Sequence, residues 1–186
     1  MKTFNEIREQ CPDWYQSGNG AWGCLQTHLA IWKQFFESSY NVQFVFENDV
    51  IFAEDFDRKF YLARKELPDN WDILYLGGQV LGDDSIHTRP KKIKKYLYRV
   101  YNVNRTHAYL IKNSSNIRKT YDLIKKSYDR RTDFFVGEHI DTVLGHYLKD
   151  INSFIILPQL AGQKAGVSSI TGGQVSERWW LHNGYN

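Results

Sequence analysis

Apolar residues recur along this chain with two different periods, and the change between the two periods predicts its secondary structure. Over residues 25–38 the apolar side chains are spaced by three or four positions, which is typical of one buried face of a helix. Residues 42–46 are instead a short run of β-branched and aromatic side chains, the composition of a buried strand. Further strands are predicted at 71–76, 96–103, 106–111 and 154–157, and further helices at 54–66, 115–126 and 137–149.

The order of these elements predicts the fold class. Helices that alternate with short apolar strands favour an α/β domain with a mostly parallel sheet. No linker divides the 186 residues, so we expect a single domain over 1–186, with loop from Pro158 onward and an irregular tail over about 172–186. Ligands of such sheets bind beyond the carboxyl ends of the strands. We therefore expect chemistry after the first two strands, at Glu47-Asn48-Asp49 and at Gly77-Gly78.

Composition and charge exclude several classes of protein. The chain has 24 Lys and Arg against 21 Asp and Glu, a balance too even for a nucleic-acid-binding protein. No apolar run approaches the ~18–20 residues of a transmembrane helix, and the N-terminus lacks the apolar core of a signal peptide. These features predict a cytoplasmic protein. The basic segment 89–95 is usually a solvated loop, but peripheral contact with an anionic membrane leaflet is also compatible with it.

The acids at 47 and 49 form the first candidate site. On an extended chain alternate side chains face the same side, so Glu47 and Asp49 would converge while Asn48 points away. Two converging carboxylates repel each other, and a divalent cation such as Mg²⁺ or Mn²⁺ relieves that repulsion. Such a cation usually completes its shell with phosphates, which points to a nucleoside diphosphate substrate. The alternative is that both are ordinary turn acids.

Cysteine and histidine positions offer weaker candidates. Cys24 and His28 have the spacing of a zinc pair on a helix, but no second Cys/His pair follows at the distance of a structural zinc site. Cys24 is therefore interpreted as a small buried residue, and His28 as a packing or hydrogen-bonding residue. His107, His146 and His182 are candidate third ligands of a cation that the sequence does not rank.

Six short motifs between residues 18 and 171 carry a family resemblance when taken together in their order. They are residues 20–24 with His28 and Trp32, residues 44–50, residues 71–77, residues 106–111, Asp141, and Pro158 with Gln163 and residues 168–170. In this order they resemble the motifs of glycosyltransferase family 25, which holds lipopolysaccharide and collagen galactosyltransferases.

The resemblance implies a GT-A-like fold of Rossmann type and a role in glycan biosynthesis, such as that of lipopolysaccharide. It implies transfer of a sugar, galactose or glucose, from a UDP-sugar to a glycan or glycoconjugate acceptor, with Mn²⁺ or Mg²⁺ as cofactor. Carried over by position, Glu47, Asn48, Asp49 and Gly77 would bind the donor, and Glu47 and Asp49 would bind the metal. Asp49, the last acid of the motif, would make the direct metal contact.

The resemblance also points to a catalytic base. A reaction that inverts the anomeric carbon needs a carboxylate to take the proton of the acceptor hydroxyl. Asp141 is the candidate, and Glu138, about one helical turn earlier, is the alternate. Both acids could instead belong to a solvated first helical turn, where they favour the helix dipole. A retaining reaction would need no such base.

Four departures from the family pattern bear on the function. Asn48 stands in place of the middle acid of the motif, which lowers the local negative charge but keeps the two same-face carboxylates. The other three keep other functions open. Residues 1–16 lack the pattern of the family's usual N-terminal strand, Ala21 stands in place of a glutamate, and Ser169 stands in place of an aspartate. One alternative is an inactive glycosyltransferase-like domain that binds a glycan, a nucleotide or a partner. Another is a different metal-dependent phosphate enzyme built on the same acids.

Overall fold

The computed structural model describes residues 3–82, 89–130, 138–168 and 170–179. Its centre is a six-stranded sheet built from β1 (Val42–Phe46), β3 (Ile73–Val80), β4 (Lys91–Lys92), β5 (Leu97–Arg99), β6 (Val103–Lys112) and β7 (Ser153–Ile156). The strands lie in the order β1-β6-β3-β7-β5-β4, so β1 and β4 are its edges.

The prediction of a mostly parallel sheet is wrong. Within the described residues β3 and β7 form a parallel pair, whereas β6 runs antiparallel to both of its neighbours, β1 and β3. The strands β5 and β4 continue the sheet in antiparallel fashion. The reason lies in the connections: α3 (Phe56–Glu66) separates β1 from β3, whereas β6 follows β3 by way of the hairpin β4–β5. Parallel neighbours need a long crossover, usually a helix.

Strand direction nevertheless brings the expected ends together. Because β6 is antiparallel to both β1 and β3, these two strands run the same way, and β7 is parallel to β3. The carboxyl ends of β1, β3 and β7 therefore lie on the same side of the sheet as the amino end of β6. The acids that follow β1 are found on this side.

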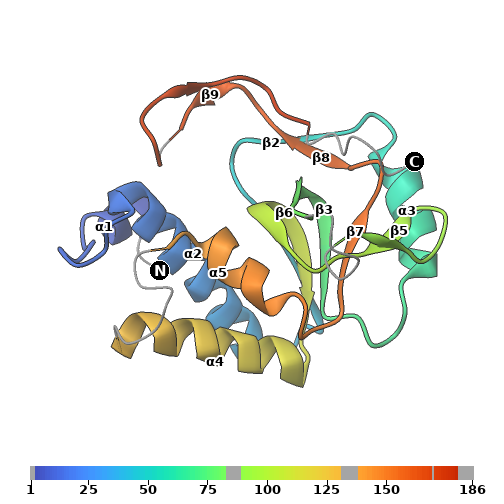
Figure 1. Cartoon of the computed structure of the whole chain (residues 1–186), viewed down its shortest axis with the longest axis horizontal. Helices are drawn as coiled ribbons and strands as arrows, with labels where there is room; N and C mark the ends of the chain where they lie inside the picture. Colours follow the sequence, from blue (N-terminus) through green and yellow to red (C-terminus); the bar gives the residue numbers. More distant parts are fainter. Residues whose placement is uncertain (1–2, 83–88, 131–137, 169, 180–186) are drawn as a thin grey trace.

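Helices cover both faces of the sheet (Figure 1). One face carries α2 (Gly18–Glu37), α4 (Ser115–Arg130) and α5 (Ile140–Tyr147), with α1 (Phe4–Arg8) packed on α2, and the other face carries α3. Alternate residues of β6 serve the two cores, since Tyr109 and Ile111 join the helix-rich side while Ala108 and Leu110 join the α3 side.

The helix α2 begins earlier than predicted, at Gly18 rather than near residue 25. Its first turns contain three glycines, which by themselves indicate a turn. A close helix contact explains one of them: a Cβ on Gly23 would lie 2.8 Å from the Phe4 ring of α1. Packing between α1 and α2 therefore overrides the low helix propensity of glycine here.

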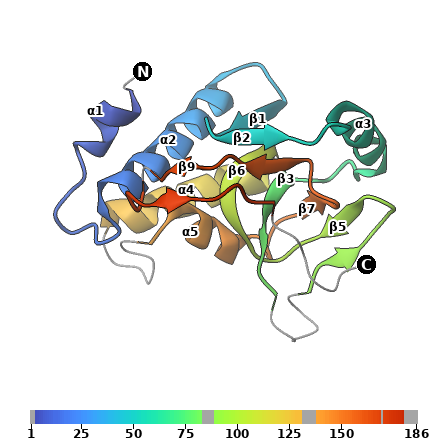
Figure 2. The same cartoon turned by 90° about the horizontal axis from the view of Figure 1, so that it is seen from above.

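The prediction that the whole segment after Pro158 is loop is wrong. It contains β8 (Ala161–Gln163), which pairs antiparallel with β2 (Val50–Phe52), and the hairpin of β9 (Gly166–Val167) and β10 (Gln174–Val175). Part of the tail expected to be irregular is thus paired, and Arg178 bridges back to Gln163. Figures 1 and 2 show this segment crossing above the edge of the main sheet and reaching over the helix side.

The strand β3 also extends further than predicted. It continues through Gly77 and Gly78 to Val80, with irregular pairing to β6 on both sides of Gly77. A Cβ on Gly77 would overlap the Ala161 carbonyl oxygen and lie 2.5 Å from His107 Nε2. Glycine is needed at this position because β8 passes directly against β3.

The basic segment lies at the far edge of the sheet. Lys91 and Lys92 form the exposed strand β4, and the Lys92 and Lys95 ammonium groups lie over the rings of Tyr98 and Tyr96. No helix among the described residues has both the length and the apolar character needed to cross a bilayer. Contact of the basic segment with a membrane surface stays a prediction.

Candidate active site

A pocket of about 270 Å³ opens at the edge where β1 ends and β6 begins. Its walls come from α2, from the start of β6, from the start of α5 and from the β8–β10 segment. The polar residues that line it are Glu47, Asn104, Arg105, Thr106, His139, Asp141, Thr142, Gln163, Ser168 and Thr171, and Ala21, Cys24, Ile140 and Ile170 complete the lining.

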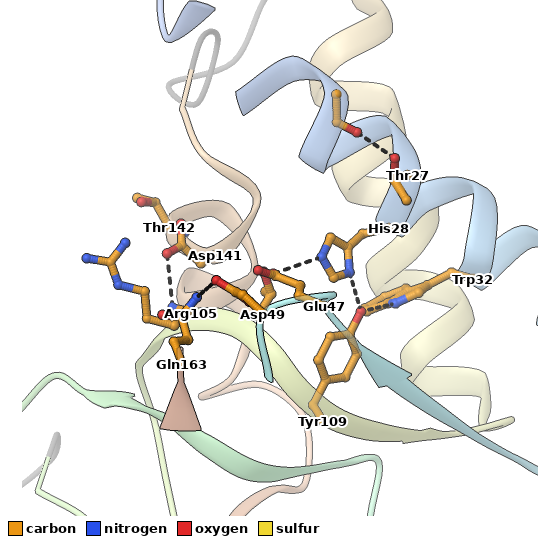
Figure 3. A network of polar contacts seen from close by, with 12 residues as sticks. Thr27, His28, Trp32, Glu47, Asp49, Arg105, Tyr109, Asp141, Thr142 and Gln163 are labelled. Atoms are coloured by element: carbon orange, nitrogen blue, oxygen red, sulfur yellow. Dashed lines mark hydrogen bonds and ion pairs between the residues drawn. The ribbon is translucent and has the colours of Figure 1, made fainter. Parts of the chain in front are cut away.

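The acids after β1 do not continue the strand, contrary to the expectation of an extended chain. Residues 47–50 form a turn in which the Val50 N–H donates to the Glu47 carbonyl at 3.3 Å. The two carboxylates consequently have different partners. Glu47 Oε1 accepts a hydrogen bond from Thr106 Oγ1 at 2.9 Å, and Asp49 Oδ2 accepts one from Gln163 Nε2 at 3.2 Å. Figure 3 shows Glu47 and Asp49 side by side between Gln163 and His28.

A buried network on α2 orients Glu47. His28 and Trp32 are four residues apart and therefore share a face of the helix, where both reach the Tyr109 hydroxyl of β6. Trp32 Nε1 donates to Tyr109 Oη at 2.8 Å, and His28 Nδ1 lies 2.8 Å from the same oxygen. On its other side, His28 Nε2 lies 3.4 Å from Glu47 Oε1 (Figure 3).

The hydrogen-bond donors and acceptors around His28 decide which of its ring nitrogens carries the proton. The indole N–H of Trp32 can only donate, so the Tyr109 hydroxyl accepts there and keeps its own proton to donate. Burial raises the pKa of Tyr109 well above its ordinary value, which keeps that proton in place. The Tyr109 oxygen has a second lone pair and could also accept from His28, so the contact with Glu47 decides the tautomer. The Glu47 carboxylate can only accept and faces His28 Nε2, which places the proton on Nε2, and the Tyr109 hydroxyl then donates to His28 Nδ1.

The surroundings of Glu47 favour its charged form. Burial alone would raise the pKa of Glu47, but the contact with His28, the Thr106 hydroxyl and the proximity of His107 outweigh it, so the pKa is lowered. Glu47 is therefore ionised at neutral pH. The same network that lowers its pKa also holds its carboxylate in one orientation.

The pKa of Asp49 is shifted in the opposite direction from that of Glu47. Burial raises its pKa, and the negative charge of Glu47 raises it further, against a smaller lowering by Gln163 and by His107. Its Oδ1 is buried and has no hydrogen-bond partner among the described residues. A buried carboxylate oxygen without a donor is costly, and such groups concentrate at functional sites.

Of the two candidate bases, Asp141 lines the pocket and holds its floor in place. Its Oδ2 accepts the Arg105 backbone N–H at 3.0 Å, and its Oδ1 accepts the Thr142 backbone N–H at 2.9 Å. Arg105 has φ 76°, a left-handed conformation that is strained for a side-chain-bearing residue. The Asp141 carboxylate thus stabilises an unusual backbone at the pocket wall.

Glu138 has a different place. Its side chain is exposed, and its carbonyl oxygen accepts hydrogen bonds from the Tyr15 and Tyr128 hydroxyls at 2.8 and 2.7 Å. These contacts anchor the chain before α5. Asp141 and Glu138, which the sequence placed together as candidate bases, are therefore separated by the fold into a pocket residue and an exposed residue.

The remaining predicted donor-binding residues differ in exposure. Asn48 is exposed at the tip of the turn, whereas Gly77 is buried beneath Ala161 and His107. The position of Gly77 supplies a packing reason for glycine, and binding of a donor by either residue stays a prediction. His107 is fully buried, and its Nε2 lies 3.3 Å from the Ala161 carbonyl oxygen.

The sequence does not reveal the roles of two residues on the pocket wall. Thr106 and Gln163 stood within the family-like motifs, and their direct contacts with Glu47 and Asp49 become visible only in the fold. Cys24 is half-buried, and its pKa is raised by burial and further by the charges of Glu47 and Asp141, so its thiol is protonated at neutral pH.

Comparison with known proteins identifies the family. The profile of glycosyltransferase family 25 (LPS biosynthesis protein) matches residues 3–141, which include α2, the acids after β1, all of β6 and Asp141. A search of curated proteins finds no significant match. The profile covers well over half of the chain, and the pocket acids lie within it. The chain therefore belongs to glycosyltransferase family 25 and is a glycosyltransferase.

Proposed function

We propose that this enzyme transfers galactose or glucose from a UDP-sugar to a hydroxyl group of a glycan or glycoconjugate, with Mn²⁺ or Mg²⁺ as cofactor. The family membership supports the reaction class. The observation that carries the rest is the buried Asp49 Oδ1, which lacks a partner among the described residues and lies beside the charged Glu47. A divalent cation would compensate both groups at once.

The residues after β1 fit such a cation. Hard oxygen ligands suit Mn²⁺ and Mg²⁺, and Asp49 offers an oxygen that no described donor satisfies. Glu47 would be the second ligand, since its carboxylate is ionised and already oriented. When bound, such an ion stabilises the negative charge that develops on the departing diphosphate.

The chain's own side chains would perform the other tasks. Arg105 lines the pocket and carries a guanidinium group, which is suited to bind a diphosphate. Asp141 would take the acceptor proton in an inverting reaction, because it lines the pocket and each of its oxygens keeps a free lone pair beside one backbone hydrogen bond. Glu138 is less suited because its side chain is exposed and its carbonyl is used to anchor the chain.

Titration calorimetry of UDP in the presence and absence of Mn²⁺ tests the binding step. We expect nucleotide binding that depends on the metal and is lost in Asp49→Asn. Asp122→Asn is the matched control, because Asp122 is an exposed acid on α4. Metal-independent UDP binding, or full binding by Asp49→Asn, would contradict the proposed role of Asp49.

A donor screen then tests the reaction. UDP-galactose, UDP-glucose and their relatives are incubated with Mn²⁺ and a lipopolysaccharide core oligosaccharide, and sugar transfer is compared with release of free sugar. We expect transfer to exceed hydrolysis for one of the two hexoses. Hydrolysis that is as fast as transfer would favour a different metal-dependent phosphate enzyme. Absence of both transfer and hydrolysis would favour an inactive binding domain.

A further inference from the structure

Three side chains of different chemistry meet on the α2 side of the pocket. The ligand atoms of Cys24, His28 and Glu47 all lie within 4.8 Å of one another. Cys24 and His28 come from consecutive turns of α2, and Glu47 comes from the turn after β1. This group is distinct from the Glu47 and Asp49 pair that the sequence predicted, because it includes a sulfur and a nitrogen donor.

The spacing between His28 and Glu47 is long for a hydrogen bond and is also compatible with two ligands of one metal ion. His28 Nε2 and Glu47 Oε1 are 3.4 Å apart, which is longer than the ~2.7–3.2 Å of a good N–H···O bond. With zinc–ligand bonds of about 2.0–2.3 Å, two ligand atoms of a tetrahedral site are separated by about 3.3–3.6 Å. The His28 and Glu47 atoms already have this separation, and the Cys24 sulfur lies within 4.8 Å of both.

The donor set selects the kind of cation. One thiolate, one imidazole and one carboxylate suit Zn²⁺ and Co²⁺, whereas Mg²⁺ prefers oxygen ligands throughout. Three protein ligands also leave a fourth position for water or a substrate group. Cys24 and Glu47 both line the pocket, so that fourth position would face it.

The network behind His28 suits a metal ligand. Metal-binding histidines usually donate their second ring N–H to an oxygen, which fixes the ring. His28 Nδ1 lies 2.8 Å from the Tyr109 hydroxyl, whose oxygen can accept from His28 as well as from Trp32. His28 itself is 5% exposed and therefore held in one orientation.

We propose that Cys24, His28 and Glu47 bind one Zn²⁺ ion at the α2 side of the pocket. On binding, the Cys24 thiol releases one proton to solvent and coordinates as thiolate. The His28 proton moves from Nε2 to Nδ1, so His28 stays neutral and coordinates through Nε2. Because Glu47 is shared, Zn²⁺ would remove one ligand from the Mn²⁺ or Mg²⁺ site of the proposed function and inhibit transfer.

Cobalt titration of the metal-free full chain tests this site. Co²⁺ substitutes for Zn²⁺ and gives a thiolate-to-metal absorption band, so the band reports coordination by a cysteine. We expect one Co²⁺ per chain, displacement by an equimolar amount of Zn²⁺, and no displacement by excess Mg²⁺. The Cys24→Ser variant should lose the band, while Cys11→Ser should keep it, since Cys11 is the other cysteine and lies outside the group.

A second variant keeps the test decisive if Cys24→Ser is poorly folded. Glu47→Gln retains the size of the side chain, and we expect it to weaken Co²⁺ binding by at least the ~10-fold that loss of an outer contact already costs. Circular dichroism confirms folding of each variant. Absence of a band in the natural chain, its survival in Cys24→Ser, or its loss in Cys11→Ser would overturn the proposal.

The two metal proposals can fail separately. Asp49→Asn should abolish Mn²⁺-dependent UDP binding but leave the cobalt band intact, since Asp49 is not part of the Cys24 group. A band that disappears in Asp49→Asn would overturn the assignment of the zinc ligands. A band that persists while no UDP binds to the natural chain would leave the zinc site standing and remove the proposed function.

Discussion

On the α2 side of the pocket the Glu47 carboxylate faces His28 and accepts a hydrogen bond from Thr106, whereas on the β8 side Asp49 is contacted by Gln163 and has one buried oxygen without a partner among the described residues. The pKa of Glu47 is lowered and that of Asp49 is raised. Two acids with one residue between them are therefore not equivalent ligands. Glu47, whose carboxylate is hydrogen-bonded, is held in place by the fold. Asp49 has an oxygen without a partner among the described residues, so a ligand that contacts it would gain the most binding energy.

The largest expected effect comes from Gly77→Ala, which would break the β8 side alone. The new methyl group would overlap the Ala161 carbonyl and push β8, with Gln163, away from Asp49. Overpacking against backbone should lower the free energy of unfolding by about 3 kcal/mol or more. Urea denaturation measures it, and Gly166→Ala is the control because a Cβ there meets no atom within 4 Å. Equal stability of both variants would show that β8 does not pack on Gly77.

Tyr109→Phe would break the α2 side. It leaves the buried Trp32 N–H without its acceptor and His28 Nδ1 without its donor. Each unsatisfied buried group costs about 1–3 kcal/mol, so a loss of about 2–3 kcal/mol is expected by urea denaturation. Tyr40→Phe, at a side chain 69% exposed, should change stability very little. A loss of stability no larger than that of Tyr40→Phe would contradict the claim that the Tyr109 hydrogen bonds hold His28 and thereby orient Glu47.

Glu47→Gln should destabilise the fold at neutral pH by about 1–2 kcal/mol, through loss of charge-assisted contacts. The folded-state pKa of Glu47 lies below its ordinary value of 4.5, so its contribution is present above that value and is lost as the pH falls through the lower one. The difference from the natural chain should therefore shrink in acid. Thermal unfolding at several pH values checks this, with exposed Glu54→Gln as control.

Asp49→Asn should have the smallest effect on stability and the opposite sign. The pKa of Asp49 is raised, so its charge destabilises the fold increasingly as the pH rises above its ordinary value of 3.8. Removing that charge should stabilise the protein by about 0.5–1 kcal/mol at neutral pH, as replacements at functional sites often do. A loss of stability, measured beside Asp122→Asn, would show that Asp49 is held in place by the fold like Glu47.

Local patterns predicted much of the fold. The helical spacing around Leu25, Leu29 and Trp32 is confirmed. Residues 42–46 form a strand as predicted, but the expectation that it is buried is wrong: β1 is an edge strand in which Val42, Phe44 and Phe46 are exposed. The strand directions could not be predicted from such patterns, because an apolar run has the same composition whichever way it runs. The position of β6 between β1 and β3 depends on long-range pairing, such as Phe44 with Leu110.

The candidate site was predicted less completely than the fold. The sequence predicts Glu47, Asp49 and Asp141 as site residues, and the fold brings Glu47 and Asp141 to one pocket. The partners that distinguish the acids lie far away in sequence: Thr106 is 59 residues from Glu47, and Gln163 is 114 residues from Asp49. The short strand β8, which carries Gln163, has no periodic pattern that could have revealed it.

The sequence by itself determined the family and the location of the acids directly after the first strand, because motif order and apolar runs are local properties. Only the tertiary structure decided which carboxylate is stabilised and which is not, since pKa and hydrogen bonding depend on what other segments bring near. It also decided that Cys24 and His28 face Glu47, which turns a helix spacing into a three-ligand group. Local pattern places a residue on an element, and packing between elements sets its chemistry.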